Sequence, residues 1–276
     1  MITELNSSEF CRCKALLNDH GQIEAKAVVE KVNPGRIFVD HIHSPTSGII
    51  WLGNNDGFIF IGNESNKEFN SNLNQFIDTV IMREALKLGL NWFEAIGNHN
   101  KWDETIKRVF ENRNIGSWNQ RVYSLQKNDY KDNYIQPIAQ GYSIVKISEK
   151  LYNNSPRSIE NMDFFHSKIL EFWSSPEKFL RNGIGYCIIY KNEIVSVCFS
   201  GFVANKIHCM DIETLEEHRG NKLAQRVALT FVEECMDKHL IPYWDCMESN
   251  KPSIAVAESI GLKNVFNYKG YEFKLE

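Results

Sequence analysis

The alternation of apolar and polar residues predicts a series of strands and helices in the first half of the chain. Short apolar runs at 48–52 and 58–61 flank a turn rich in glycine and asparagine, which is typical of two paired strands. Apolar residues then recur at spacings of three and four over 73–88, which predicts an amphipathic helix. The elements expected after it are a strand at 91–96, a short helix at 102–112 and a strand at 121–125.

The second half repeats this order of elements. A hairpin is expected at 186–199 and a further strand at 207–214. Leu223 begins a helix of about four turns with one apolar face. The other elements expected in this half are helical material at 158–182, a strand at 242–246, a short helix at 253–260 and a last strand or hairpin at 265–275. The repeated order predicts two similar units of mixed α/β (α+β) class.

A polar run from Gln126 to Gln136 suits a surface link between these units. We therefore expect an N-terminal domain at 1–137 and a C-terminal domain at 138–276. The length of 276 residues is enough for two domains that each bury a core.

Composition narrows the class of protein. With 43% hydrophobic and 24% charged residues, an ordinary globular protein is expected. The net charge of -4 gives no sign of a nucleic-acid-binding surface. No apolar stretch approaches the roughly 18 residues that span a bilayer, and the first residues do not resemble a signal peptide. We expect a soluble cytoplasmic protein with free thiols and neither a membrane nor a nucleic-acid partner.

The stretch most informative about chemistry is the turn after the strand at 207–214. The first amides of a helix have no internal acceptor, and the helix dipole is positive there, so the start at Leu223 can bind an anion. Gly220 permits close approach of a phosphate, while Arg219 and Lys222 add positive charge. A simple glycine helix start with solvated charges is the alternative interpretation.

At this turn the chain resembles the GNAT superfamily of acyl-CoA-dependent N-acyltransferases. The family signature is Gln/Arg-x-x-Gly-x-Gly/Ala at the start of the helix after the fourth strand. We match it to residues 217–222, where Arg219-Gly220 fits and where Glu217 and Lys222 replace the first and last signature residues. The trailing Leu223-Ala224 also fits.

A second motif extends the resemblance over about residues 138–276. GNAT proteins follow the next strand with Asn-x-x-Ala/Ser before a short helix, and Asn250 and Ser253 stand in that order here. The chain looks like the bacterial GNAT group that carries an extra N-terminal half. The resemblance implies tandem GNAT-like units, each a mostly antiparallel sheet flanked by helices. Because Gly62 to Glu68 contains acidic residues and no Arg-Gly pair, the N-terminal unit is expected to be a degenerate, non-catalytic copy.

The resemblance implies an acetyl-CoA-dependent N-acetyltransferase that transfers an acetyl group to the amine of a small molecule. Acetyl-CoA is then the co-substrate, and no metal is expected. By analogy the cofactor-binding residues are Ile212, Thr214, His218, Arg219, Gly220, Asn221, Lys222, Leu223, Ala224, Asn250 and Ser253.

The catalytic groups are expected on one face of the strand at 207–214. An amine with a pKa near 10 is mostly protonated at pH 7, so a base is useful. Strand alternation puts Glu213 and Asp211 on one face, opposite Ile212, and makes Glu213 the first candidate and Asp211 the second. A solvated or ion-paired carboxylate is the alternative interpretation. Weaker candidates for the base are His208, Tyr243 and Asp245.

The tyrosine that many GNAT enzymes use as general acid falls at Ala257 and is absent. Two other functions stay open. One is an acyl-CoA-binding sensor or scaffold without catalysis. The other is an aminoacyl transferase that uses tRNA, which the net charge does not favour. The acceptor amine is left open, and a homodimer is possible.

Overall fold

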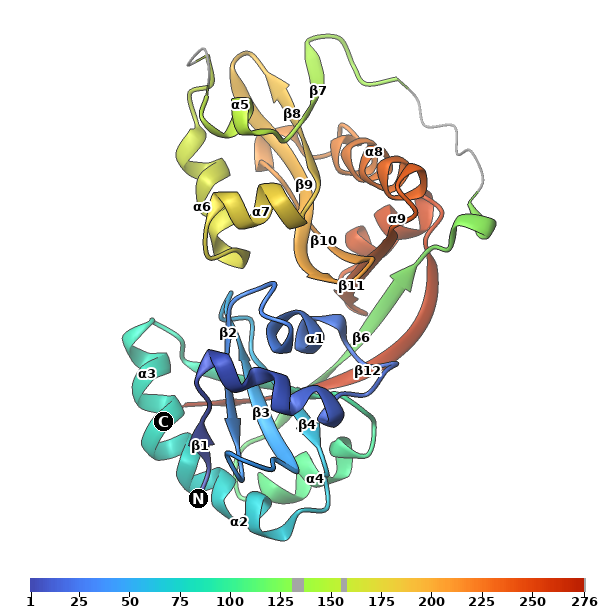
Figure 1. Ribbon diagram of the computed structural model, residues 1–276. Helices are drawn as coiled ribbons and strands as arrows, with labels where there is room; N and C mark the ends of the chain where they lie inside the picture. The colour runs from blue at the N-terminus through green and yellow to red at the C-terminus, as the bar shows by residue number, and fades with distance from the viewer. Residues whose placement is uncertain (131–136, 155–157, 276) are drawn as a thin grey trace. The chain divides into compact units, whose positions relative to one another are not determined.

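The computed structural model describes residues 1–130, 137–154 and 158–275, which form two compact units (Figure 1). Unit 1 comprises Met1–Gln120 together with the residues from Tyr268 onward, and unit 2 comprises Arg121–Asn267. The units therefore divide at 120/121, whereas the sequence analysis placed the boundary at 137/138. Residues 131–136 of the expected link lie outside the described residues. Within the described ranges, none of the helices has the length and apolar character needed to cross a membrane.

In unit 1 the strands follow the order β1-β2-β3-β4-β5-β12. β4 and β5 run parallel, and the other neighbouring pairs are antiparallel. The strands are β1 (Thr3–Glu4), β2 (Gly35–Val39), β3 (Ser47–Leu52), β4 (Phe58–Gly62), β5 (Trp92–Gly97) and β12 (Lys263–Lys274). The helices are α1 (Ile23–Val29), α2 (Lys67–Phe76), α3 (Met82–Lys87) and α4 (Trp102–Val109), with a 3-10 helix at Ser7–Leu16 and a π-helical turn at Ile77–Ile81.

In unit 2 the strands follow the order β6-β11-β10-β9-β8-β7. β10 and β11 run parallel, while β7 to β10 pair with one another antiparallel. The strands are β6 (Gly116–Ser124), β7 (Tyr142–Lys146), β8 (Gly185–Tyr190), β9 (Glu193–Ala204), β10 (Ile207–Thr214) and β11 (Ile241–Met247). The helices are α5 (Glu149–Tyr152), α6 (Met162–Phe172), α7 (Pro176–Asn182), α8 (Leu223–Asp237) and α9 (Lys251–Ser259), with 3-10 turns at Lys127–Asp129 and Glu216–His218.

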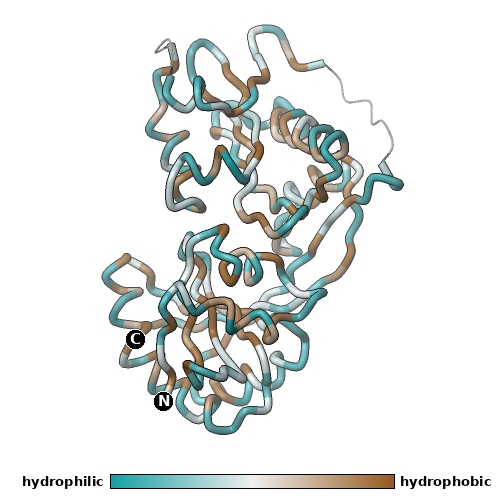
Figure 2. The backbone as a smooth tube through the Cα atoms, viewed as in Figure 1, coloured by the Kyte–Doolittle hydropathy of each residue, from teal (hydrophilic) through white to brown (hydrophobic). Residues whose placement is uncertain are grey.

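Each unit has its own apolar core, and Figure 2 shows hydrophobic residues concentrated on the strands inside each unit. In unit 1 the core is largely aromatic: Phe93 stacks on Phe58 and on Phe273, and Trp102 lies against Phe60. Burial of each such side chain contributes about 1.5–3 kcal/mol relative to leaving it exposed.

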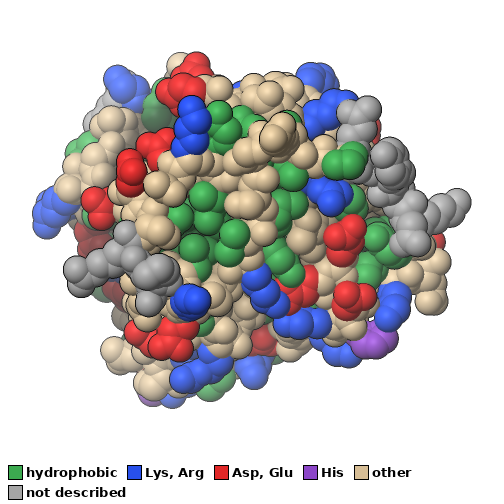
Figure 3. Space-filling model, turned by 90° about the horizontal axis from the view of Figure 1, so that it is seen from above, with side chains coloured by type: hydrophobic (Ala, Val, Ile, Leu, Met, Phe, Trp, Pro, Cys, Tyr) green, Lys and Arg blue, Asp and Glu red, His purple; other side chains and the backbone are tan. Residues whose placement is uncertain are grey.

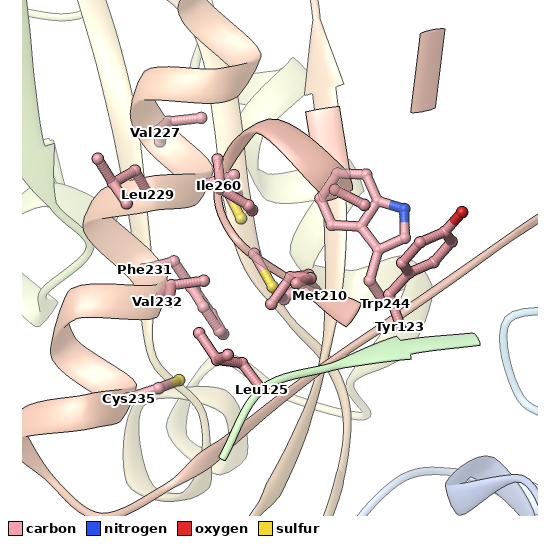
Figure 4. Close-up of a cluster of buried hydrophobic side chains, with 14 of the residues drawn as sticks. Tyr123, Leu125, Met210, Val227, Leu229, Phe231, Val232, Cys235, Trp244 and Ile260 are labelled. Atoms are coloured by element: carbon pink, nitrogen blue, oxygen red, sulfur yellow. The ribbon is translucent and has the colours of Figure 1, made fainter. Parts of the chain in front are cut away.

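The core of unit 2 lies between its sheet and helices α8 and α9 (Figure 4). Val227, Phe231 and Cys235 of α8 are fully buried at spacings of four, as the helical pattern predicts. Met210 of β10 and Trp244 of β11 point into the same cluster. One face of β10 is thereby fixed against α8.

The mixed α/β class and the repeated order of elements are confirmed. Each predicted strand and helix has a counterpart. The elements β1, β2, β7, α1, α5 and the 3-10 helix at Ser7–Leu16 were not predicted. The sequence predicts that the strand at 121–125 belongs to the N-terminal unit and the strand at 265–275 to the C-terminal unit. The structure shows the reverse. β6 from Arg121 onward belongs to unit 2, and β12 from Tyr268 onward belongs to unit 1. Tyr271 of β12 is opposite Ala95 of β5, and Ser124 of β6 donates to the Pro242 carbonyl of β11 at 2.9 Å.

Candidate active site

The predicted anion-binding turn lies between β10 and α8. Gly220 and Lys222 both adopt the left-handed backbone region, with φ of 82° and 59°. The helix forms its first backbone hydrogen bond from Arg226 N to Lys222 O, at 3.1 Å. The amides at the start of α8, from Leu223 to Gln225, therefore have no acceptor inside the helix. Amides without an acceptor at the positive end of the helix dipole favour an anion.

The side chains around this turn include two accessible cations, Arg219 and Lys222, and two exposed acids, Glu216 and Glu217. Arg219 and Lys222 are exposed, and among the described residues neither forms an ion pair with a carboxylate. The Nε of Arg219 donates to the carbonyl of Thr214 at 3.1 Å, which holds the guanidinium beside the turn. A Cβ on Gly220 would meet no heavy atom within 4 Å. The turn thus has both open space and unneutralised positive charge.

Arg226, which sequence reasoning missed, adds a third cation one helical turn after Lys222. Its Nε is buried and has no hydrogen-bond partner among the described residues. A buried donor of this kind is costly unless something accepts from it. The observation fits a bound anion near the start of α8.

An aromatic cluster anchors the turn to the sheet. Nδ1 of His218 lies 2.9 Å from the hydroxyl of Tyr142, and the Tyr142 ring stacks on Tyr190 with centroids 4.5 Å apart. Asn221 Nδ2 donates to the carbonyl of His218 at 3.1 Å, inside the turn. His218 and Asn221 therefore shape the turn, and β7, which carries Tyr142, gave no signal in the sequence analysis.

The two central strands of unit 2 pair over only part of their length. The register of β10 with β11 ends at Cys209 opposite Tyr243, although β10 continues to Thr214 and β11 to Met247. On its other side β10 pairs with β9 up to Thr214, with a shift between Cys209 and Met210. The segment of β10 that holds the predicted Ile212 and Thr214 thus has β9 on one side and lies beyond the β11 register on the other.

The face of β10 that points away from α8 carries the predicted carboxylates. Glu213 forms an ion pair with Lys168 of α6, with 2.6 Å between Oε2 and Nζ. In this structure Glu213 is therefore an ion-paired carboxylate, which is the alternative interpretation given for it above. Glu171 of α6 lies 3.4 Å from the same ammonium. Burial alone would lower the pKa of Lys168, but the bond to Glu213 and the charges of Glu171 and Asp211 outweigh it and raise the pKa.

The remaining candidates for the catalytic base lie on both faces of the strands β10 and β11. His208 faces α8: its ring is buried, Nδ1 is 2.8 Å from Ser200 Oγ, and burial lowers its pKa to about 4. Tyr243 and Asp245 share the face of Asp211, because Tyr243 is opposite Cys209 in the register. His208 is therefore a neutral core residue, whereas the other two lie on the carboxylate face.

At the start of α9 the predicted residues have local partners. Asn250 Oδ1 accepts from the amide of Ser253 at 3.1 Å and so caps the helix. The hydroxyl of Ser253 accepts from Trp244 Nε1 at 3.1 Å. Ala257, at the place of the family's tyrosine, is fully buried in the core of unit 2. Contacts of Asn250 and Ser253 with a cofactor stay a prediction.

The corresponding turn of unit 1, between β4 and α2, is filled by the chain itself. The carboxylate of Asp40 accepts from the amide of Thr46 at 2.9 Å and from Asn66 Nδ2 at 2.8 Å. Asn66 in turn caps α2 by accepting from Phe69 N at 3.0 Å. A Cβ on Gly62 would lie 2.3 Å from the carbonyl of Thr46, so this turn is closely packed.

The turn of unit 1 also carries negative charge. Burial alone would raise the pKa of Asp40, but hydrogen bonds from Thr46, Ser47 and His41 lower it. The pKa of Glu64 is lowered too, chiefly by its own backbone amide and then by Ser65 and the charge of His99. Both groups are anions at the site where unit 2 exposes cations.

Comparison with known proteins identifies the family. The family model described as GNAT acetyltransferase matches residues 14–271. The chain belongs to the GNAT acetyltransferase family. The match extends through both units.

Similar proteins agree with this assignment. The chain is 27% identical over 273 residues to the uncharacterized N-acetyltransferase YdfB of Bacillus subtilis (strain 168), covering 98% of each chain. Among solved structures, a GCN5-related N-acetyltransferase-like protein from Streptococcus suis 89/1591 matches with a TM-score of 0.66 and 21% identity, over 97% of this chain and 100% of that one. A tandem GNAT protein from the clavulanic acid biosynthesis pathway matches with a TM-score of 0.62 and 10% identity, over 100% and 99%. Both matches show a shared fold, and the second is a tandem GNAT protein.

The backbone of the turn favours a GNAT signature register two residues later than the one predicted. In that register Arg219 is the first residue and Ala224 the last, and both match the family pattern. Lys222 then stands at the glycine position, and its φ of 59° is the conformation for which glycine is usually needed. Glu217, which did not fit the signature, precedes it in this register.

Proposed function

We propose that this GNAT protein transfers an acetyl group from acetyl-CoA to the amine of a small molecule. The observation that carries the proposal is the start of α8, where free amides, the open Gly220 and unpaired cations meet. A diphosphate is the anion that such a turn fits, because backbone amides and basic side chains both bind phosphate oxygens.

The residues that would hold acetyl-CoA are those of the turn and of the adjacent edge of β10. Arg219, Lys222 and the amides from Leu223 onward would bind the diphosphate, with Gly220 allowing close approach. The pantetheine arm would lie along β10 at Ile212 and Thr214, where the register with β11 has ended, as an added strand does. When bound, acetyl-CoA supplies the thioester carbonyl that the amine attacks.

The carboxylate face of β10 would handle the amine. Glu213 already binds the primary ammonium of Lys168, so this face stabilises an ammonium group. We assign to Glu213, with Asp211 beside it on the same face, the binding of the amine and the removal of its proton before attack. The departing thiolate, with an ordinary pKa near 8.5, takes its proton from solvent because Ala257 offers no acid.

The direct test is release of free thiol when the purified protein is incubated with acetyl-CoA and a panel of amines. We expect Glu213→Gln to lower the turnover number about 100-fold while leaving the Kd for CoA unchanged. Glu171→Gln is the matched control, because Glu171 also contacts Lys168 but lies on α6. Full activity of both Glu213→Gln and Asp211→Asn would show that these carboxylates are not the base.

A second candidate function is acyl-CoA binding without catalysis. The ion pair of Glu213 with Lys168 and the buried Ala257 favour it, because both remove groups that catalysis uses. Binding of CoA with no thiol release for any amine would support this alternative. Transfer from tRNA gains less support, since lysine and arginine are interspersed with acidic side chains on the face shown in Figure 3.

A further inference from the structure

Helix α6 is packed so that Lys168 lies against the carboxylate face of β10. The next residue, Ile169, is fully buried and anchors the helix in the core. The helix comes close to the sheet at Gly201, where a Cβ would lie 3.0 Å from the ring of Phe172 and 3.4 Å from Cβ of Asp211. This packing holds the side chain of Lys168 beside β10.

The ammonium of Lys168 makes its closest contact with the carboxylate to which we assign proton removal. Its Nζ lies 2.6 Å from Oε2 of Glu213 and 3.4 Å from Oε2 of Glu171. Among the described residues, Lys168 is the one ion-pair partner of Glu213. A general base acts over about 2.6–3.2 Å, so this pair already has the separation that proton transfer needs.

Lys168 also lies beside the segment of β10 that the proposed function gives to acetyl-CoA. The pantetheine arm would lie along β10 at Ile212 and Thr214, and Glu213 is the residue between them. A primary amine bound to Glu213 is then beside the thioester, as an external acceptor would be. The protein thus holds a lysine of its own where the substrate amine is expected.

We propose that Lys168 is acetylated by the active site of its own chain, with Glu213 as the base. The inference rests on the proposed function and adds a modification site to it. The class of acceptor is a primary alkyl ammonium, which Lys168 shares with a small-molecule amine.

The reaction begins with Lys168 as an ammonium, which cannot attack until a base removes a proton. Glu213 takes that proton and passes it to solvent. The nitrogen then forms a bond to the thioester carbonyl carbon and loses a second proton to solvent, while the carbon–sulfur bond breaks. The thiolate of CoA leaves and takes one proton from solvent. The product is a neutral amide, so Glu213 loses its ion-pair partner.

Peptide mapping by mass spectrometry tests the proposal. The purified chain, shown by its intact mass to start unacetylated, is incubated with isotope-labelled acetyl-CoA and no added amine. We expect label on Lys168 to appear about tenfold faster than on Lys146 and Lys238, because a base assists only Lys168 in this reaction. Those two lysines are also ion-paired in unit 2, but their side chains are 50% and 51% exposed, against 27% for Lys168. Unassisted acetylation would therefore favour the two more exposed lysines.

Two variants and one kinetic measurement identify the base and the chain that reacts. Glu213→Gln is expected to slow the labelling of Lys168 about 100-fold. Glu171→Gln is the matched control, because Glu171 contacts the same ammonium from α6, and it should leave the rate close to the wild-type value. The rate constant should not change with protein concentration, because the lysine and the base belong to one chain.

Equal labelling of the three lysines would overturn the proposal, and so would labelling that Glu213→Gln does not slow or a rate constant that rises with protein concentration. Thiol release with an external amine while Lys168 stays unlabelled would also overturn it, and would leave the proposed function intact. If no amine releases thiol and no lysine is labelled, the proposed function itself fails, which is a different result.

Discussion

Helix α2 of unit 1 and helix α8 of unit 2 occupy corresponding places in the two units. They begin in opposite electrostatic surroundings. Both follow a strand with a parallel neighbour, β4 beside β5 and β10 beside β11. At α2 the carboxylate of Asp40 fills the turn, and Gly62 has no room for a ligand. At α8 Gly220 is open, and Arg219 and Lys222 are exposed.

The difference between the two turns indicates that a strand followed by a helix is not sufficient for a phosphate site. In unit 1 the start of α2 is capped by Asn66, and the side-chain amide of Asn66 donates to the carboxylate of Asp40. We infer that unit 1 does not bind CoA and that the Asp40 cluster serves stability.

The largest expected effect comes from making α8 resemble α2. Gly220→Asp places a carboxylate in the open turn and is expected to weaken CoA binding about 100-fold, or about 2.7 kcal/mol. Isothermal titration with CoA measures it. Gly89→Asp is the matched control, because Gly89 is also left-handed, with no heavy atom within 4 Å of a Cβ, but lies in unit 1. Unchanged affinity of Gly220→Asp would remove this turn from the site.

The second-largest effect is expected when the negative charge of Asp40 in unit 1 is removed. Asp40→Asn is expected to lower the unfolding free energy by about 1.5–3 kcal/mol at pH 7, because Asp40 accepts hydrogen bonds as an anion. Urea unfolding measures it, and Asp19→Asn, at an exposed turn position, is the control. CoA binding should stay at the wild-type value; a weaker affinity would contradict the separation of the two turns.

The same variant has a pH signature. The pKa of Asp40 is lowered in the folded state, so its contribution is complete above the unfolded pKa near 3.9 and is lost as pH falls below it. The difference in unfolding free energy between wild type and Asp40→Asn should therefore shrink below about pH 4. A difference that does not depend on pH would mean that the charge of Asp40 is not what stabilises the turn.

The smallest effect concerns the anchor of the α8 turn. Tyr142→Phe removes the hydroxyl that contacts His218 and is expected to lower the unfolding free energy by about 0.5–1.5 kcal/mol. CoA binding should weaken by less than tenfold, since only the position of the turn changes. Tyr190→Phe keeps the stacked ring and leaves the His218 bond in place, so it is the control. A loss as large as that of Gly220→Asp would indicate that Tyr142 touches the ligand.

Several features of the site could be predicted from local sequence because they depend on neighbours along the chain. The glycine and the basic residues before Leu223 indicate an anion-binding helix start, and the alternation of β10 places Glu213 opposite Ile212. The structure confirms that Glu213 and Ile212 lie on opposite faces, since Ile212 packs against the core under α8 and Glu213 contacts α6. Their roles with acetyl-CoA and an amine stay predictions.

Other features depend on residues far apart in sequence. Lys168 reaches Glu213 from a helix whose orientation the sequence pattern does not give, and Tyr142 reaches His218 from a strand that shows no strong apolar alternation. Asp40 reaches Asn66 across two strands. Such contacts between distant residues change the charge and the position of a motif's side chains, although the sequence of the motif stays the same.

By itself the sequence determined most of the strands and helices, the repeat of their order, and the turn that begins α8, because periodicity and backbone preference act over a few residues. Only the tertiary structure decided which unit received β6 and β12, and that Asp40 lies beside Asn66 at the start of α2. Either unit can pair with an alternating strand, and any nearby carboxylate can accept from the side chain that caps a helix. Which one does so is fixed by the packing of residues that are distant in the chain.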